Sequence, residues 1–252
     1  MAKIISIFNH KGGVGKTTIA INLAASFAYL GKRVLLIDSD PLGGATSGLG
    51  FNRYELKKGL YNVLITDNDI NDFIKETSLE NLFLIPSTPL LSGAEIEMLA
   101  LYKNSHSRLK NRLDVLKEHY DYIIIDCAPG IGLNVNNLTA SDLLVIPSKS
   151  DFLSKEGLRE TLNTFERIKK SYNNDFEIGG ILLNTSRNYK ANLYIEKDIY
   201  RLVGDKVYNT TIPKTIKIPE SQLEGKPLIE YSPRNRATIA FIKVAKEVLV
   251  NE

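Results

Sequence analysis

The stretch Asn9-His10-Lys11-Gly12-Gly13-Val14-Gly15-Lys16-Thr17-Thr18 decides the fold of this chain. It follows an apolar, β-branched run at residues 3–8, which is typical of a buried strand, and it precedes residues 19–30, whose apolar spacing predicts a helix. A glycine-rich loop between a strand and a helix turns its backbone N–H groups inward on an anion. The sequence therefore predicts a phosphate-binding loop.

The side chains of this loop predict the ligand. Lys16 would bring a cation to the outer phosphates of a nucleotide, and the Thr17 hydroxyl would be a ligand of Mg²⁺. The common P-loop has a glycine where this chain has His10, and Lys11 is an additional lysine, so the loop is a variant with two lysines. The residues of the loop expected to bind the nucleotide are Lys11, Gly12, Gly13, Val14, Gly15, Lys16, Thr17 and Thr18.

Carboxylates follow two further predicted strands. Residues 34–37 form an apolar run that ends in Asp38-Ser39-Asp40-Pro41, and residues 122–125 form a run of one tyrosine and three isoleucines that ends in Asp126. Open α/β sheets bind their ligands at the carboxyl ends of strands, so we interpret Asp38 and Asp40 as binding a metal or activating water, and Asp126 as holding Mg²⁺ directly or through water. The alternative is that Asp38 and Asp40 only cap a turn.

Composition excludes several classes of protein. One cysteine and three histidines among 252 residues make a disulfide framework or a structural zinc site improbable and suit a reducing cytoplasm. No apolar run is long enough to span a bilayer, and the N-terminus lacks a signal-peptide pattern. The net charge of +3 is too small to indicate nucleic acid by itself, but residues 187–236 hold ten Lys/Arg against six Asp/Glu.

Strands alternating with helices along the chain predict a doubly wound, mostly parallel sheet with helices on both faces, formed by residues 1–252 as a single P-loop domain. We expect a helix at residues 69–77, a solvated basic helix face at 103–112, and a loop from Lys217 to Pro227. Asn184, at the end of a predicted strand, would read an adenine edge or cap the next turn. Ile212 and Pro213 are further candidates for contact with the nucleotide.

Several motifs together resemble the ParA/Soj-type partition ATPases within the wider ParA/MinD group. The likeness covers nearly the full chain. The matching segments are residues 11–18, 38–41, 45–50, 121–127, 156–158 and 225–227.

This resemblance implies an ATPase that dimerises on binding ATP. Lys11 would reach across the dimer to the partner's phosphates, as an arginine finger does. Lys16 would grip the β- and γ-phosphates, and Asp40 would position the attacking water. Thr17, Asp38 and Asp126 would hold or support Mg²⁺. The resemblance also implies a ParB-like activating protein as a partner.

The chain departs from the family pattern beside Asp40. The family usually has Asp-Pro-Gln-Gly-Asn there, whereas this chain has Leu42 and Gly44 in place of the Gln and Asn. Losing two amides predicts hydrolysis that is slower or more dependent on a partner. Lysines at 214 and 217 replace the family's arginine, which keeps the charge but loses a bidentate grip on phosphate.

The expected function is ATP-dependent, non-specific DNA binding that partitions a chromosome or plasmid in the cytoplasm, on the nucleoid. The residues expected to bind DNA are Arg187, Lys190, Lys214, Lys217, Arg234 and Arg236. One alternative is a relative that positions another cargo without binding DNA. The other is a MinD-like membrane ATPase, which we do not favour because the chain ends in Asn251-Glu252 with no basic amphipathic tail after the last helix.

Overall fold

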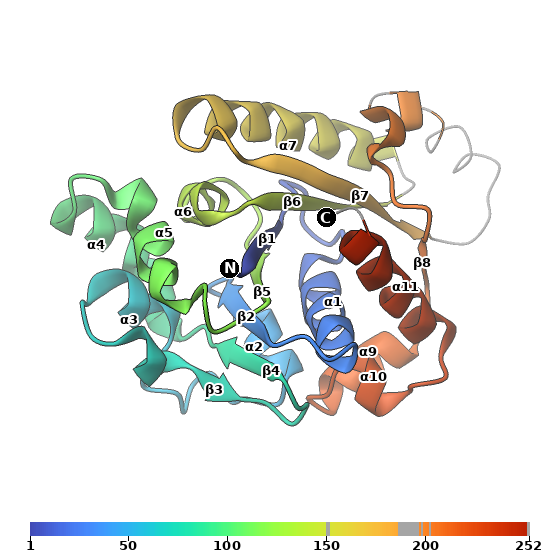
Figure 1. Cartoon of the computed structure of the whole chain (residues 1–252), viewed down its shortest axis with the longest axis horizontal. Helices are drawn as coiled ribbons and strands as arrows, with labels where there is room; N and C mark the ends of the chain where they lie inside the picture. Colours follow the sequence, from blue (N-terminus) through green and yellow to red (C-terminus); the bar gives the residue numbers. More distant parts are fainter. Residues whose placement is uncertain (150–151, 186–196, 198, 202, 251–252) are drawn as a thin grey trace.

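Figure 1 shows the computed structural model, which describes residues 1–149, 152–185, 197, 199–201 and 203–250. Within these residues eight strands form one sheet in the order β3-β4-β2-β5-β1-β6-β7-β8. All neighbouring strands are parallel except β3 and β4. The strands are β1 (Lys3–Ile7), β2 (Val34–Ser39), β3 (Lys75–Glu76), β4 (Leu82–Ile85), β5 (Tyr122–Cys127), β6 (Leu143–Lys149), β7 (Glu177–Thr185) and β8 (Ile212–Pro213). The predicted mostly parallel sheet is confirmed.

Helices cover both faces of the sheet, as predicted (Figure 1). One face is packed by α3 (Leu60–Ile65), α4 (Ala94–Leu101), α5 (Arg108–Leu113), α6 (Asn134–Ala140) and α7 (Phe152–Ser171). The other is packed by α1 (Lys16–Tyr29), α2 (Gly44–Gly48), α10 (Leu228–Tyr231) and α11 (Arg236–Val250).

The pleat of the central strands divides their side chains between the two cores. In β5, Ile123 and Ile125 belong to the core under α3–α7, whereas Tyr122 and Ile124 belong to the core under α1 and α11. Asp126 continues the second set and Cys127 the first. Because β1 lies between β5 and β6, the loop after β1 opens at the centre of the sheet's carboxyl edge.

Two predictions of local structure are wrong. Residues 69–77 form a short 3₁₀ turn (Ile70–Phe73) and then β3, which pairs antiparallel with β4 through two residues only. A two-residue strand is too short to produce an alternating pattern. The expected loop from Lys217 to Pro227 contains α9 (Lys217–Leu223), whose Gln222 amide donates to the Thr18 hydroxyl of α1 at 3.3 Å.

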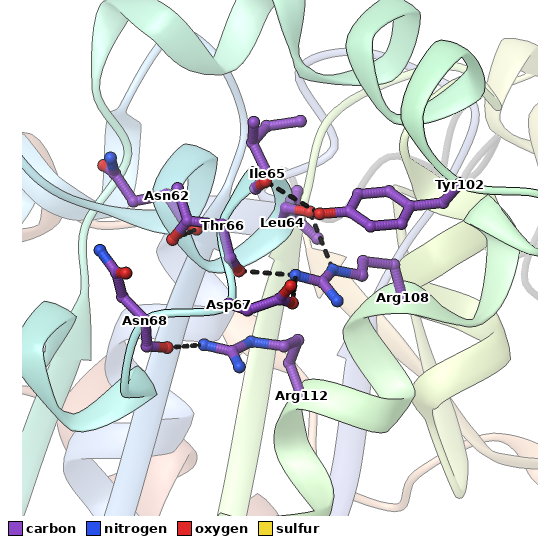
Figure 2. Close-up of polar contacts among 9 residues, drawn as sticks. All are labelled: Asn62, Leu64, Ile65, Thr66, Asp67, Asn68, Tyr102, Arg108 and Arg112. Atoms are coloured by element: carbon purple, nitrogen blue, oxygen red, sulfur yellow. Dashed lines mark hydrogen bonds and ion pairs between the residues drawn. The ribbon is translucent and has the colours of Figure 1, made fainter.

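The basic face predicted to be solvated is instead partly used in packing (Figure 2). Arg108 is 13% exposed, and its guanidinium donates to the carbonyls of Leu64 and Thr66 at the carboxyl end of α3 and to the Asp67 carboxylate. Arg112 donates to the Asn68 carbonyl. The Leu64 and Thr66 carbonyls lie at the end of α3, where a helix leaves its carbonyls without internal partners, and Arg108 satisfies them while placing positive charge at the negative end of the helix dipole.

Candidate functional site

The loop between β1 and α1 has the geometry of a phosphate cradle. Gly13 and Gly15 have φ angles of 71° and 94°, in the left-handed region that glycine adopts without strain. Val14 between them is fully buried and fixes the loop to the core. α1 begins at Lys16, so its first backbone N–H groups face the loop. The predicted strand, loop and helix are all present in the expected places.

Lys16 lies inside the loop. Its side chain is 7% exposed, and its ammonium donates to the carbonyls of Asn9 and Lys11, each at 3.0 Å. Burial lowers the pKa of Lys16 below its ordinary value, while Cys127, Asp126 and Asp40 act in the opposite direction. Among the described residues, these two carbonyls are the hydrogen-bond partners of the ammonium, and phosphate oxygens, which carry full charge, would be stronger acceptors.

Asn9 organises the loop, and sequence reasoning missed it. It is fully buried; its amide donates to the Pro147 carbonyl at 2.7 Å, and its carbonyl oxygen accepts from the Lys11 N–H at 2.9 Å. These two contacts tie the backbone of Lys11 to the end of β6. A single asparagine next to a glycine loop gives no pattern that would have revealed this role.

α7 packs closely on the same loop. A Cβ at Gly157 would lie 3.0 Å from the Cβ of Lys11 and 3.3 Å from the Asn9 side-chain oxygen. Only a glycine lets the helix come this near without displacing the loop. The Thr161 hydroxyl of the next turn accepts from the His10 N–H at 3.1 Å. The close approach of α7 to the loop is the physical reason for a glycine at position 157, within the segment 156–158 that matches the family pattern.

Asp38 and Asp126 face each other across neighbouring strands. They are register partners on β2 and β5, and both are fully buried. Asp38 accepts from the Thr46 N–H and hydroxyl at 2.7 and 2.6 Å, and from the Asp40 N–H at 3.2 Å. Burial raises the pKa of Asp38 to about 6, against the opposing effect of these hydrogen bonds. Thr46, on α2, was also missed from the sequence.

Asp126 is the less satisfied of the two carboxylates. Neither of its buried oxygens has a partner in hydrogen-bonding geometry among the described residues. Burial, followed by the nearby Asp38, raises the pKa of Asp126 well above its usual range, with the Thr17 hydroxyl opposing the shift. Orphaned buried oxygens of this kind are what a divalent cation would satisfy, so the residues present fit Mg²⁺. Among the described residues no group of three or more His, Cys, Asp or Glu is placed to hold a metal ion by itself.

Asp40 lies at the start of the turn after β2. One of its carboxylate oxygens accepts from the Leu42 N–H at 2.9 Å, and its side chain is half-buried. Leu42 is 78% exposed. A Cβ at Gly44 would lie 3.1 Å from the Thr17 methyl group and 3.4 Å from its hydroxyl oxygen. Gly44, which replaces the family's asparagine, therefore lies close against the predicted magnesium ligand Thr17, where an added Cβ would be crowded.

A cavity of about 440 Å³ adjoins the loop. Its lining brings together the predicted residues Asn184, Ile212 and Pro213 with Gly13, Gly15 and Thr18, and adds Lys149, Lys214, Thr215, Ile218 and Pro219. The Asn184 amide donates to the Val14 carbonyl at 2.5 Å, so it supports the phosphate loop from the side of the cavity. The adenine contact considered from the sequence stays a prediction, since Asn184 also lines this cavity.

The predicted DNA-binding residues that the structure describes come from two neighbouring segments, since the Asn235 amide donates to the Thr215 hydroxyl at 3.4 Å. Arg187 and Lys190 are outside the described residues. Lys214, Arg234 and Arg236 are exposed, whereas Lys217 forms an ion pair with Glu220 at 2.7 Å. Arg236 lines a second cavity, of about 460 Å³, together with Lys243, Asn209, Thr210 and Thr211. Lys243 is a basic residue that the sequence analysis did not select.

The fold and the loop define a P-loop nucleotide-binding protein, and comparison with known proteins narrows the class. A family model described as an AAA domain matches residues 2–178. Over the full length of both chains, this chain is 46% identical to the sporulation initiation inhibitor protein Soj of Bacillus subtilis. It is 38% identical to the chromosome partitioning protein ParA of Caulobacter vibrioides, over 99% of this chain and 95% of that one.

A solved structure of a protein from the same wider group has a similar fold. The septum site-determining protein MinD of Pyrococcus horikoshii, complexed with Mg-ADP, superposes with a TM-score of 0.81 at 28% identity, over 98% of this chain and 96% of that one. The chain belongs to the ParA/Soj family of partition ATPases. In the part of the chain that the structure describes, no helix combines the length and apolar character needed to cross a bilayer.

Proposed function

We propose that this chain hydrolyses ATP with Mg²⁺ and uses the ATP-bound dimer to hold DNA without sequence preference during chromosome or plasmid partition. The observation that carries the proposal is the buried Lys16 ammonium, which points into the glycine loop. The negative charges of Asp126 and Asp40 lie near enough to favour its protonated form. We infer that residues 1–252 act as one P-loop ATPase domain in the cytoplasm, on the nucleoid.

The charged and hydroxyl side chains of the site each have a chemical role in this proposal. Lys16 leaves its two carbonyls and binds the β- and γ-phosphates. Bound Mg²⁺ would neutralise charge on those phosphates, with Thr17, Asp38 and Asp126 as the residues that hold or support it. Asp40 exchanges the Leu42 N–H for the attacking water and orients it toward the γ-phosphorus.

Lys11 acts on the partner copy. Its backbone N–H donates to the Asn9 side chain, and α7 approaches it closely at Gly157. The Lys11 side chain therefore leaves the loop from a defined position. From there its charge reaches the phosphates bound by a second copy of the chain, where negative charge develops during transfer. A ParB-like protein then stimulates hydrolysis, and the dimer separates.

The cavity beside the loop holds the nucleoside. Ile212 and Pro213 offer an apolar wall for the base, and Asn184 offers amide hydrogen-bonding groups. The DNA surface combines the exposed Lys214, Arg234 and Arg236 with Lys243. Lys217 contributes less, because its ammonium is already paired with Glu220. Two copies of this surface in a dimer would double the number of phosphate contacts.

Retention on DNA in the presence of ATP, ADP or no nucleotide tests this function. We expect retention of non-specific duplex DNA with Mg-ATP only, weakening steeply as salt rises, because phosphate contacts release counterions. Arg236→Ala should weaken retention at every salt concentration and reduce the salt slope by about one. Lys32→Ala, at the opposite end of α1 from the loop, is the matched control and should bind as the native chain does.

Three results would contradict parts of this proposal. Equal retention with ADP would remove the nucleotide switch. ATP hydrolysis without binding to any DNA would favour the positioning of another cargo. Sedimentation with anionic liposomes in ATP would favour a MinD-like membrane role.

A further inference from the structure

A connected set of buried amides and hydroxyls lies beneath the carboxyl ends of β2 and β5, on the face opposite Asp38 and Asp126. Ser39 follows Asp38 in β2, so its side chain points to the other side of the sheet. There it meets Asn137 of α6: the Asn137 amide donates to the Ser39 hydroxyl at 2.8 Å, and that hydroxyl is 3.1 Å from the Asn137 carbonyl oxygen. Both residues are fully buried.

The set continues to the loop after β5. The Asn137 amide also donates to the Asn134 side-chain oxygen at 2.9 Å. The Asn134 amide in turn donates to the carbonyls of Ala128 and Gly130, at 2.8 and 2.7 Å. Asn134 thus holds the backbone on both sides of Pro129, where Gly130 turns the chain with a φ angle of 85°. We call Ser39, Asn137 and Asn134 the amide relay.

The relay joins two segments that the proposed chemistry requires. Its first end, Ser39, lies between Asp38 and Asp40. Its second end holds the loop that directly follows Asp126 and Cys127. β2 and β5 are neighbours whose last paired residues are Ser39 and Cys127, yet beyond that pair no backbone ladder connects the two segments. The relay is therefore a side-chain connection that continues past the end of this ladder.

The relay is also firmly anchored. The Ser141 hydroxyl donates to the Asn137 backbone carbonyl at 2.8 Å and lies 2.7 Å from the Ser6 hydroxyl of β1. Buried polar groups that satisfy one another in this way hold one arrangement, because breaking any single bond leaves a buried donor or acceptor unpaired. Movement of one end of the relay thus costs free energy unless the other end moves with it.

We propose that Asn137 is a positioning residue for ATP hydrolysis, which sets the place of Asp40 according to the conformation of the loop at residues 128–130. This inference rests on the proposed function for its catalytic meaning. A movement of this loop on nucleotide binding would carry the Asn134 side chain with the Ala128 and Gly130 carbonyls to which it donates. Asn137 and Ser39 follow, and the backbone that carries Asp40 is adjusted. Asn137 itself touches neither nucleotide nor water.

Two variants and one matched control test the relay. Asn137→Leu removes its central amide at similar volume, and Ser39→Ala removes only one hydroxyl and so keeps the test open if the first variant does not fold. Asn136→Leu is the control, because Asn136 is a buried amide on the same helix that accepts from the Leu109 N–H of α5, away from both loops. Thermal denaturation shows the loss of stability common to all three.

Single-turnover hydrolysis separates positioning from stability. We expect Asn137→Leu to lower the rate at saturating Mg-ATP by about tenfold or more while ATP affinity stays within about threefold, because a displacement of about 1 Å at a reacting group has effects of this size. Ser39→Ala should give a smaller loss, and the double variant should be no slower than Asn137→Leu alone. Asn136→Leu should keep the native rate. A native rate in Asn137→Leu, or equal losses in Asn137→Leu and Asn136→Leu, would overturn the proposal.

Hydrogen exchange tests the coupling without any hydrolysis. Ser39→Ala lies on β2, yet we expect it to speed amide exchange in residues 128–133 as well as in residues 40–43. Asn136→Leu should leave both segments unchanged. Exchange that rises only in residues 40–43 would overturn the relay. If the native chain hydrolysed no ATP, the proposed function would fail, and this exchange result would still decide whether the two loops are coupled.

Discussion

Lys16→Ala should lower the affinity for ATP and ADP by about 100-fold or more. The Lys16 ammonium lies in the loop with 7% of its side chain exposed, and phosphate oxygens would replace two neutral carbonyls as its acceptors. A charge-assisted hydrogen bond in a buried site contributes about 1.5–3 kcal/mol, and each 1.4 kcal/mol is a factor of ten in affinity. Two such bonds account for the expected loss.

Titration with a fluorescent nucleotide measures this effect directly. Circular dichroism of Lys16→Ala should match that of the native chain, since the partners of the lysine within the described part of the chain are two carbonyls of its own loop. Lys32→Ala, which changes a half-exposed lysine just beyond the other end of α1, should bind nucleotide with native affinity. Undiminished affinity in Lys16→Ala would refute the assignment of the phosphate site.

Asp126→Asn should have two opposite effects. Without nucleotide it should raise the free energy of unfolding at pH 8 by about 1–3 kcal/mol, because it removes a buried charge that receives no hydrogen bond from the residues the structure describes. With nucleotide it should remove most of the additional stability that Mg²⁺ provides, because one of the oxygens that support the metal is lost. These opposite effects are expected of a carboxylate that destabilises the folded chain but is needed to support the metal.

The pH dependence has a definite sign. The pKa of Asp126 in the folded chain is raised above its ordinary value of 3.8, so between these two pKa values the folded state holds a proton that the unfolded state has released. Stability without nucleotide should therefore fall as pH rises from about 4. The loss of stability caused by deprotonation of Asp38 should extend to about pH 6. The loss caused by deprotonation of Asp126 should continue up to the raised pKa of that residue. Asp126→Asn should flatten the later part, as thermal denaturation from pH 4 to 9 would show. A slope unchanged by the substitution would contradict the account.

The sequence predicted the parts of the site that depend on local pattern. The glycine loop, Lys16 and Thr17 follow from their place between a strand and a helix, and Asp38 and Asp126 follow from the strand ends that place both carboxylates at one edge. β3 escaped prediction because two residues carry no periodicity. Arg108 was expected in solvent, since charge alone does not reveal that helix carbonyls of α3 lie within its reach.

The remaining residues are defined by contacts across the fold. Asn9 meets Pro147 of β6, Thr46 meets Asp38, and Asn137 meets Ser39, at separations of 138, 8 and 98 residues. An isolated asparagine or threonine is ordinary in any sequence, and only the folded chain shows that these are buried and bonded to the site. Positioning residues are therefore harder to predict from one sequence than the groups they position.

The association state of the chain with nucleotide tests the central claim most directly. Sedimentation velocity of the native chain should show a dimer with Mg-ATP and a monomer with Mg-ADP. Lys11→Ala should remain a monomer in Mg-ATP while still binding the nucleotide, because its charge is needed only by the partner copy. A native chain that is saturated with ATP and sediments as a monomer would contradict the account, as would a Lys11→Ala dimer of native stability.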